Sequence, residues 1–400
     1  MAVTLDSIKF NHDPATATNA INIRKNATEV INVPEWRAGI SVSPEDSRAA
    51  YAIKETTGQT LTILARIRWT GPSANQPVEI RALDPNVNPP SRPGCIGFIL
   101  WLIRSIIRAL FGNVLGEVKA KAVTFGAGEL SAYETFELLN TRVDKVGVGI
   151  RTTTWRWQYR VGGDPWTDFD TSTHRIYVLL EVPNAPWQQA PYTDSNTQLP
   201  WTDVLDRACA WAMLATDRDT AAAKVTSAVY NLGNSVITYD CPGGGASHYA
   251  HPNFDCTAFL QRIAGSLSNG QYVNCTDCAT FVSTFANAVG CDLWQSRMGW
   301  FFDLNPLLAI GSSTWQTACG WGGFSYHEVA WKGGCNAPDP VFDACLQVDG
   351  DADPTVTPHI PLLPTNMTFG TPGSGDYRDK LSPSGNCDPQ PSSRTHRSVF

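Results

Sequence analysis

The stretch NCTDCATFVSTFANAVGC, residues 274–291, has the pattern of a helix with one buried face. Its apolar residues return at helical spacing and form a stripe made of Ala279, Val282, Ala286 and Val289. Asn274 or Thr276 can cap the first turn, and Gly290 supplies a stop. The pattern therefore predicts a helix that begins at Cys275.

Two cysteines, Cys275 and Cys278, stand near the start of this helix. Cys275 lies at the N-terminus, where unpaired N–H groups and the helix dipole favour a thiolate. Cys278 lies one turn further in, where this field is weaker and burial is expected. Asp277 lies about 200° around the helix from Cys275, and an acid in the first turn also stabilises a helix without any chemical role. The position in the helix selects Cys275 as the candidate nucleophile.

A thiolate nucleophile needs a base beside it and a group that orients the base. In GGFSYHEVAWKGG, residues 322–334, alternation predicts a strand that carries His327 on the same face as Val329 and Trp331. A histidine on an apolar face is often only a core residue. Asp343 follows in a second short strand, however, and adjacent antiparallel strands can place the two side chains side by side. We therefore expect His327 to be the base and Asp343 the residue that orients it.

These residues together resemble the transglutaminase-like superfamily, whose members are papain-related enzymes with a Cys-His-Asp triad. The resemblance rests on Cys-x-Asp-x-Ala at the start of a helix, His-x-x-x-Trp on a strand, and an aspartate sixteen residues after the histidine. It covers residues 200–350 and implies an α+β, papain-like domain in which Cys275, His327 and Asp343 are catalytic. It also implies acyl transfer through a thioester, with a protein or peptide as substrate. Some family members are inactive, so a catalytically inactive binding domain is the alternative.

Two other interpretations of the same cysteines stay open. His248 and His251, with Cys275 and Cys278, form a His-x2-His and Cys-x2-Cys set that can bind zinc tetrahedrally. A Cys-x-x-Cys pair at a helix start is also typical of thioredoxin-like redox sites, although no βαβ pattern precedes it here. Neither interpretation explains the downstream histidine and aspartate, so we expect a site without metal or cofactor.

The first part of the chain has the alternation of β-strands. LTILARIRWTG, residues 61–71, and TTWRWQYRVGG, residues 153–163, place apolar side chains on one face and arginines on the other. Several such segments bounded by turns predict an all-β, sandwich-like domain over residues 1–186. We expect its arginine-rich face to be solvated.

Composition then changes along the chain. Residues 187–200 are rich in Pro, Asn and Gln, which predicts a linker. Residues 201–370 show helical spacing followed by alternating strands, which predicts the α+β domain. Residues 371–400 lack periodicity and are expected to form a flexible tail. The sequence thus predicts a multidomain protein.

One strongly apolar insertion interrupts the first domain: CIGFILWLIRSIIRALFGNVLG, residues 95–116. Arg104 and Arg108 fall on one helical face and interrupt the run too early for a spanning helix. We expect an amphipathic helix packed on its own domain or on a partner, with contact to a membrane surface as the alternative.

Charge excludes one class of partner. The chain has 37 acidic and 30 basic residues, a net charge of −7 and no basic run, so we expect no nucleic acid. Its first residues, MAVTLDSIKFNHD, contain no apolar signal-peptide core, which favours a cytoplasmic protein or one exported by another route. The 11 cysteines leave at least one thiol unpaired, and their pairing does not follow from the sequence.

Overall fold

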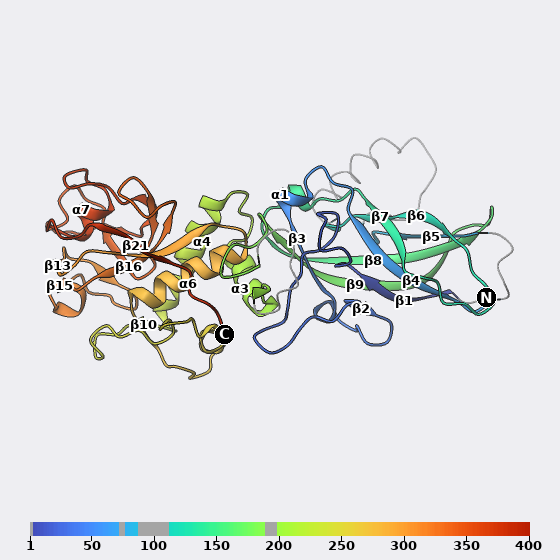
Figure 1. Cartoon of the computed structure of the whole chain (residues 1–400), viewed down its shortest axis with the longest axis horizontal. Coiled ribbons are helices and arrows are strands. Elements are labelled where there is room, and N and C mark those ends of the chain that lie inside the picture. The colour runs from blue at the N-terminus through green and yellow to red at the C-terminus, as the bar shows by residue number, and fades with distance from the viewer. Residues whose placement is uncertain (1–2, 72–76, 87–111, 189–197) are drawn as a thin grey trace. The chain divides into compact units, whose positions relative to one another are not determined.

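The computed structural model describes residues 3–71, 77–86, 112–188 and 198–400 (Figure 1). Contacts between Cα atoms divide the chain into two compact units. The first unit consists mostly of residues up to Val182, and the second mostly of residues from Pro183 onward. Each unit has a main sheet of its own.

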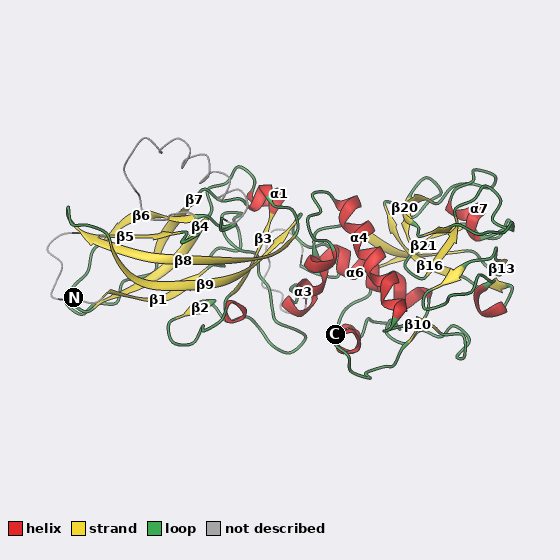
Figure 2. Cartoon of the chain, turned by 180° about the vertical axis from the view of Figure 1, so that it is seen from behind, coloured by secondary structure: helices red, strands yellow, loops and turns green. Residues whose placement is uncertain are grey.

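The first unit is built on one continuous sheet of nine strands, which curls around its buried face (Figures 1 and 2). In order across the sheet, the strands are β2 (Trp36–Arg37), β1 (Val3–Lys9), β4 (Thr62–Trp69), β7 (Glu134–Leu139), β6 (Glu117–Val123), β5 (Val78–Leu83), β8 (Gly149–Val161), β9 (Thr167–Leu179) and β3 (Arg48–Ala52). Neighbouring strands are antiparallel, apart from the parallel pair β3 and β9. A short helix, α1 (Ile53–Thr56), follows β3.

The alternation predicted for these strands is confirmed. In β4, Ile63, Ile67 and Trp69 are buried while Arg68 is exposed. In β8, Trp155 and Trp157 are fully buried in the same core. The predicted sandwich-like domain is confirmed as a mostly β unit. Its nine strands form one curled sheet, in which β7 pairs with β4 on one side and with β6 on the other. Curling lets one sheet cover its own apolar face.

Two predicted features fall largely outside the described residues. The apolar insertion at residues 95–116 is described only from residue 112 onward, and the linker at 187–200 only at its ends. Among the helices that the structure describes, none is both long and apolar enough to cross a membrane.

The second unit has helices first and strands later, the order that the sequence predicts. Its helices are α3 (Thr202–Trp211), α4 (Arg218–Asn231), α5 (Cys256–Ile263), α6 (Cys275–Ala288) and α7 (Tyr377–Leu381). Its main antiparallel sheet has the order β20 (Thr365–Thr368), β17 (Pro340–Phe342), β16 (His327–Lys332), β12 (Leu293–Met298) and β21 (Pro389–Thr395). Smaller sheets pair β10 (Thr238–Tyr239) with β11 (Tyr272–Val273), β13 (Phe302–Asp303) with β15 (Gly323–Phe324), and β18 (Leu346–Asp349) with β14 (Leu308–Ala309) and β19 (Pro361–Leu362).

Helix α6 forms the centre of the second unit. It packs against β16 and β12 of the main sheet and against helices α3 and α4 (Figure 2). All 14 of its residues are buried, whereas the sequence pattern predicted one buried stripe. The difference arises because sheet and helices cover the helix on more than one side.

Residues 371–400 are not a flexible tail, so this prediction is wrong. They contain α7 and β21, and β21 pairs with β12, with Met298 opposite Pro389 and Gln295 opposite Thr395. Beyond β21, the Phe400 amide donates to the Phe254 carbonyl at 3.1 Å. This segment is ordered by pairing with distant parts of the chain. A local sequence pattern does not record such pairing, so the segment was predicted to be flexible.

Candidate active site

Cys275 is the first residue of α6, as the sequence predicts. The Asn274 side chain accepts from the Asp277 amide at 3.0 Å, and the Asp277 carboxylate accepts from the Asn274 amide at 3.1 Å. This capping box fixes the start of the helix. Gly290, with a φ of 96°, ends it just past Val289 in a conformation that glycine adopts without strain. Cys275 thus lies at the N-terminal end of α6, and the residue is 5% exposed.

His327 opens β16, and Asp343 directly follows β17. The two strands are antiparallel neighbours, with Ala330 opposite Phe342. Nε2 of His327 lies 2.9 Å from Oδ2 of Asp343, and the two residues are 0% and 1% exposed. The prediction that these strands place the two side chains side by side is confirmed.

The electrostatics of His327 are set by its neighbours. Burial lowers the pKa of His327, but the charge and hydrogen bond of Asp343 outweigh burial, and the nearby Cys275 side chain adds to the effect, so that the pKa rises to about 10. Nδ1 of the ring is buried and has no hydrogen-bond partner among the described residues. Phe324 stacks on the ring, with 5.4 Å between the centroids. Asp343 therefore holds Nε2, and Nδ1 is the ring nitrogen left to interact with Cys275.

A further residue, Tyr377, also holds Asp343. The Tyr377 hydroxyl donates to Oδ2 at 2.7 Å, and the Cys345 amide donates to Oδ1 at 2.7 Å. Tyr377 is fully buried, and burial raises the pKa of its hydroxyl. Sequence reasoning missed this residue because it lies in the predicted tail. The one local signal for this helix in the sequence is the spacing of four residues between the apolar side chains of Tyr377 and Leu381. Both residues are buried in the structure.

Asp277 organises the loop that precedes α5. Its carboxylate accepts from the Ser247 hydroxyl at 2.8 Å and from the amides of His248, Tyr249 and Ala250, each at 2.9 Å. Burial raises the pKa of Asp277, and these backbone donors oppose the rise. Asp277 therefore does more than interact favourably with the helix dipole, because its hydrogen bonds also connect residues 247–250 to the helix that carries Cys275.

Replacing Asp277 by alanine is expected to lower the free energy of unfolding by about 3 kcal/mol, because several buried donors lose their acceptor. Asp217 provides a matched control, since it caps α4 at an exposed position by accepting from Thr220 N at 2.8 Å. Asp217→Ala is expected to cost about 1 kcal/mol. Urea denaturation at pH 7 measures both values. Equal losses in the two variants contradict the assigned role of Asp277.

The residues of the two other interpretations have the following surroundings in the described part of the chain. Cys275 and Cys278 are both free, buried thiols. Residues 3–71, 77–86, 112–188 and 198–400 contain no group of three or more His, Cys, Asp or Glu side chains placed to hold a metal ion. His248 instead places Nε2 2.9 Å from Oδ2 of Asp240. Cys278 is fully buried; burial raises its pKa, and a hydrogen bond with Cys345 partly opposes the rise.

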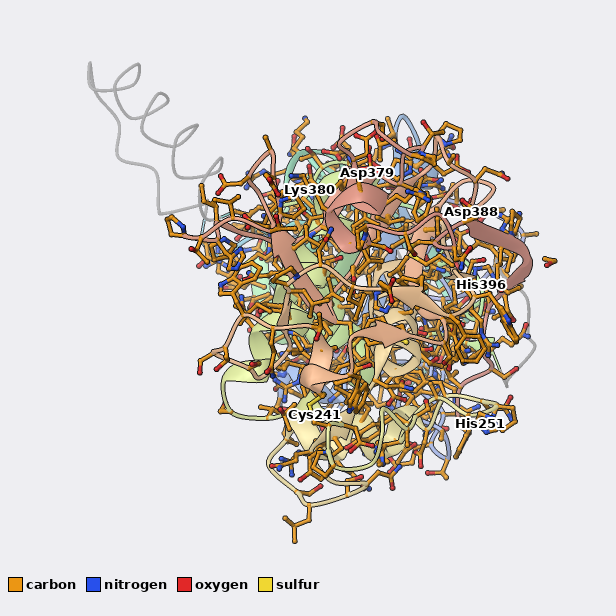
Figure 3. The ribbon with its side chains drawn as sticks, turned by 90° about the vertical axis from the view of Figure 1, so that its left-hand side faces the viewer. Cys241, His251, Asp379, Lys380, Asp388 and His396 are labelled. Carbon is orange, nitrogen blue, oxygen red and sulfur yellow. A yellow bond between two sulfur atoms is a disulfide. The ribbon has the colours of Figure 1, made fainter. Side chains whose placement is uncertain are left out.

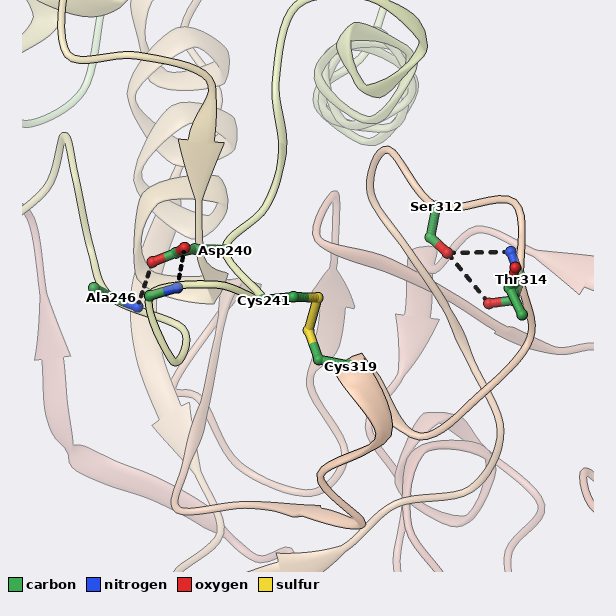
Figure 4. Close-up of a disulfide and its surroundings, with 7 residues drawn as sticks. Asp240, Cys241, Ala246, Ser312, Thr314 and Cys319 are labelled. Atoms are coloured by element: carbon green, nitrogen blue, oxygen red, sulfur yellow. Dashed lines mark hydrogen bonds between the residues drawn. A yellow bond between two sulfur atoms is a disulfide. The ribbon is translucent and has the colours of Figure 1, made fainter.

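A disulfide, whose pairing the sequence left open, lies near the site. It joins Cys241 to Cys319, next to Asp240, which accepts from the Gly243 and Ala246 amides (Figure 4). Two residues before Cys241, Tyr239 stacks on Phe324 with 6.3 Å between the ring centroids. Because Phe324 also covers the His327 ring, the disulfide joins two segments that carry the aromatic cover of the site.

Known proteins show a weak structural likeness to this chain. No protein-family model matches the sequence, and no curated protein matches it. Among solved structures, the crystal structure of red sea bream transglutaminase is similar with a TM-score of 0.33 and 10% sequence identity. The match covers 77% of this chain and 50% of that chain.

Proposed function

We propose that the second unit is a transglutaminase-like domain and that it transfers acyl groups from a protein or peptide substrate. Cys275 is the nucleophile, His327 the acid and base, and Asp343 the residue that orients His327. The acceptor of the acyl group is water or an amine, which gives hydrolysis, deamidation or transamidation.

The observation that supports this proposal is the orientation of the His327 ring. Asp343 occupies Nε2, while Nδ1 is buried and has no hydrogen-bond partner in the described chain. A buried polar atom without a partner is costly in a purely structural role. The nearby Cys275 thiol is a suitable partner for Nδ1, and in unliganded enzymes this catalytic contact is often longer than a hydrogen bond.

In the proposed mechanism, Cys275 and His327 form a thiolate–imidazolium pair. The Cys275 sulfur attacks the carbonyl carbon of an amide, and a C–S bond forms. His327 transfers its proton to the leaving nitrogen as the C–N bond breaks, which leaves a thioester on Cys275. His327 then accepts a proton from water or an amine, which attacks the thioester, and the C–S bond breaks. In this mechanism, amides at the N-terminus of α6 stabilise the oxyanion in both steps.

Iodoacetamide labelling tests the proposal without knowledge of the substrate. At pH 6 an ordinary thiol with a pKa near 8.5 is less than about 1% ionised, so a thiolate paired with an imidazolium should react at least about 30-fold faster. Burial raises the pKa of the other thiols for which a shift is resolved: Cys256, Cys278, Cys335, Cys345 and Cys387. We therefore expect Cys275 to be labelled first, as measured by peptide mass spectrometry over time.

The same experiment addresses the alternative of an inactive binding domain. If Cys275 is labelled no faster than the other free cysteines, the thiolate is not formed and the inactive alternative is favoured. Labelling in urea, where all thiols are exposed, is the control for intrinsic reactivity.

A further inference from the structure

An open pocket of about 340 Å³ is lined by residues that are next in the chain to the proposed nucleophile and base. Thr276, which follows Cys275, and Tyr326, which precedes His327, both line it, and their hydroxyl oxygens lie 3.3 Å apart. His251 and His396 line it as well and lie toward the same edge of the molecule in Figure 3. Residues adjacent in the chain to both proposed catalytic residues thus form one wall of the pocket.

Two arginines, Arg297 and Arg397, complete the pocket, whose lining contains no acidic residue. The Arg397 side chain is only 10% exposed and donates from both terminal nitrogens to Glu328, so this pair is internally neutralised. Arg297 is different, because its side chain is 45% exposed and its Nε is 3.6 Å from Glu328. Its guanidinium lies 4.4 Å from the centroid of the Tyr326 ring. One carboxylate therefore faces two guanidinium groups, and Arg297 retains a positive charge toward the pocket.

A second carboxylate, Asp277, lies behind the wall formed by Ser247 and Ala250. It is 0% exposed and receives hydrogen bonds from five groups of the loop and the helix cap. Because its lone pairs are occupied and its surface is covered, Asp277 does not present an acidic group to the pocket. The exposed charge of the pocket is that of Arg297.

We infer that this pocket is a substrate subsite for an anionic group, so that the acyl donor carries a carboxylate close to the reacting amide. The inference rests on the proposed function and adds the substrate class. Arg297, held in place by the Tyr326 ring and by Glu328, pairs with the substrate carboxylate. An acidic peptide side chain is the corresponding natural group.

Alkylation with two reagents of different charge tests this inference. Iodoacetate and iodoacetamide carry out the same displacement at sulfur, but only iodoacetate is an anion. Arg297→Gln is expected to lower the ratio of the iodoacetate rate to the iodoacetamide rate at Cys275 by at least about threefold at low salt, and Arg297→Lys should restore most of it. Arg394→Gln is the matched control, because Arg394 lies 3.5 Å from the Trp294 ring centroid, is not among the pocket residues, and its replacement changes the net charge equally.

A competition experiment uses ligands closer in size to a peptide side chain. The α-amide of N-acetylglutamate should slow iodoacetamide labelling of Cys275 more than the α-amide of N-acetylglutamine does, because only the first carries a carboxylate. This difference should disappear in Arg297→Gln but not in Arg394→Gln. Equal protection by the two ligands, or a rate ratio that does not depend on Arg297, overturns the inference while leaving the nucleophile in place. Slow labelling of Cys275 by both reagents instead overturns the proposed function.

Discussion

Replacing Cys275 by alanine is expected to abolish acyl transfer, with a loss of at least about 10⁴-fold, because no other group supplies the nucleophile. Turnover can be followed by mass spectrometry on a peptide mixture to which a primary amine is added. Hydrolysis then splits a peptide, deamidation converts glutamine to glutamate, and transamidation adds the mass of the amine. The fast phase of iodoacetamide labelling should disappear in the same variant.

Cys278→Ala is the matched control for this prediction. Cys278 lies one turn away on α6, is 0% exposed, and has a pKa that burial raises. Its loss is expected to cost about 1 kcal/mol of stability through a small cavity and to leave turnover near that of the wild type. If Cys275→Ala keeps its activity while Cys278→Ala loses it, the nucleophile has been assigned to the wrong cysteine.

Asp343→Asn is expected to lower acyl transfer by about 10³-fold, since it removes the charge that orients His327 and stabilises its protonated form. The same change should lower the free energy of unfolding at neutral pH by about 3 kcal/mol, because one partner of a buried pair is lost. Without Asp343, burial is the main remaining influence on the ring, and it lowers the pKa of His327.

The pH dependence of stability provides an independent test of this pair. The pKa of His327 is raised from 6.5 to about 10 in the folded protein. A raised histidine pKa stabilises the fold fully below the unfolded value, and this stabilisation is lost as the pH rises from 6.5 through about 10. The stability advantage of the wild type over Asp343→Asn, measured by urea denaturation, should therefore shrink across this range. An advantage that grows with pH contradicts the assigned ion pair.

Tyr377→Phe separates the orienting hydrogen bond from the charge. It removes one donor to Asp343 and keeps the His327–Asp343 pair, so the expected loss of stability is about 1.5 kcal/mol. The decline of stability with pH should persist, and the loss of turnover should be smaller than in Asp343→Asn. A loss of turnover equal to that of Asp343→Asn indicates that Tyr377 has more than a positioning role.

Much of the site was predictable because its signals are local. The start of α6 follows from a capping residue and helical spacing around Cys275, and these depend on neighbours within one or two turns. The strand that carries His327 follows from alternation within a few residues. The alternating strands of the first unit were predictable for the same reason, although whether they form two sheets or one was not.

The missed parts of the site come from the end of the chain. Tyr377 reaches Asp343 and Arg397 reaches Glu328 from the segment 371–400, which has no local pattern of strand or helix sufficient to predict its order. These contacts join residues 34 and 69 positions apart in the chain. No rule of local sequence spacing predicts contacts between residues this far apart in the chain, because these contacts depend on where β21 pairs and on how α7 packs.

By itself, the sequence determined the helix that begins at Cys275, the strand that carries His327, the short strand that Asp343 directly follows, and the β-structure of the first unit. Each follows from short-range periodicity and capping. Only the tertiary structure decided that every residue of α6 is buried, that Asp343 holds Nε2 of His327 rather than Nδ1, and that Arg297 lines a pocket together with Thr276 and Tyr326. The reason is that burial, ring orientation and the sharing of one carboxylate between two arginines depend on which distant elements meet.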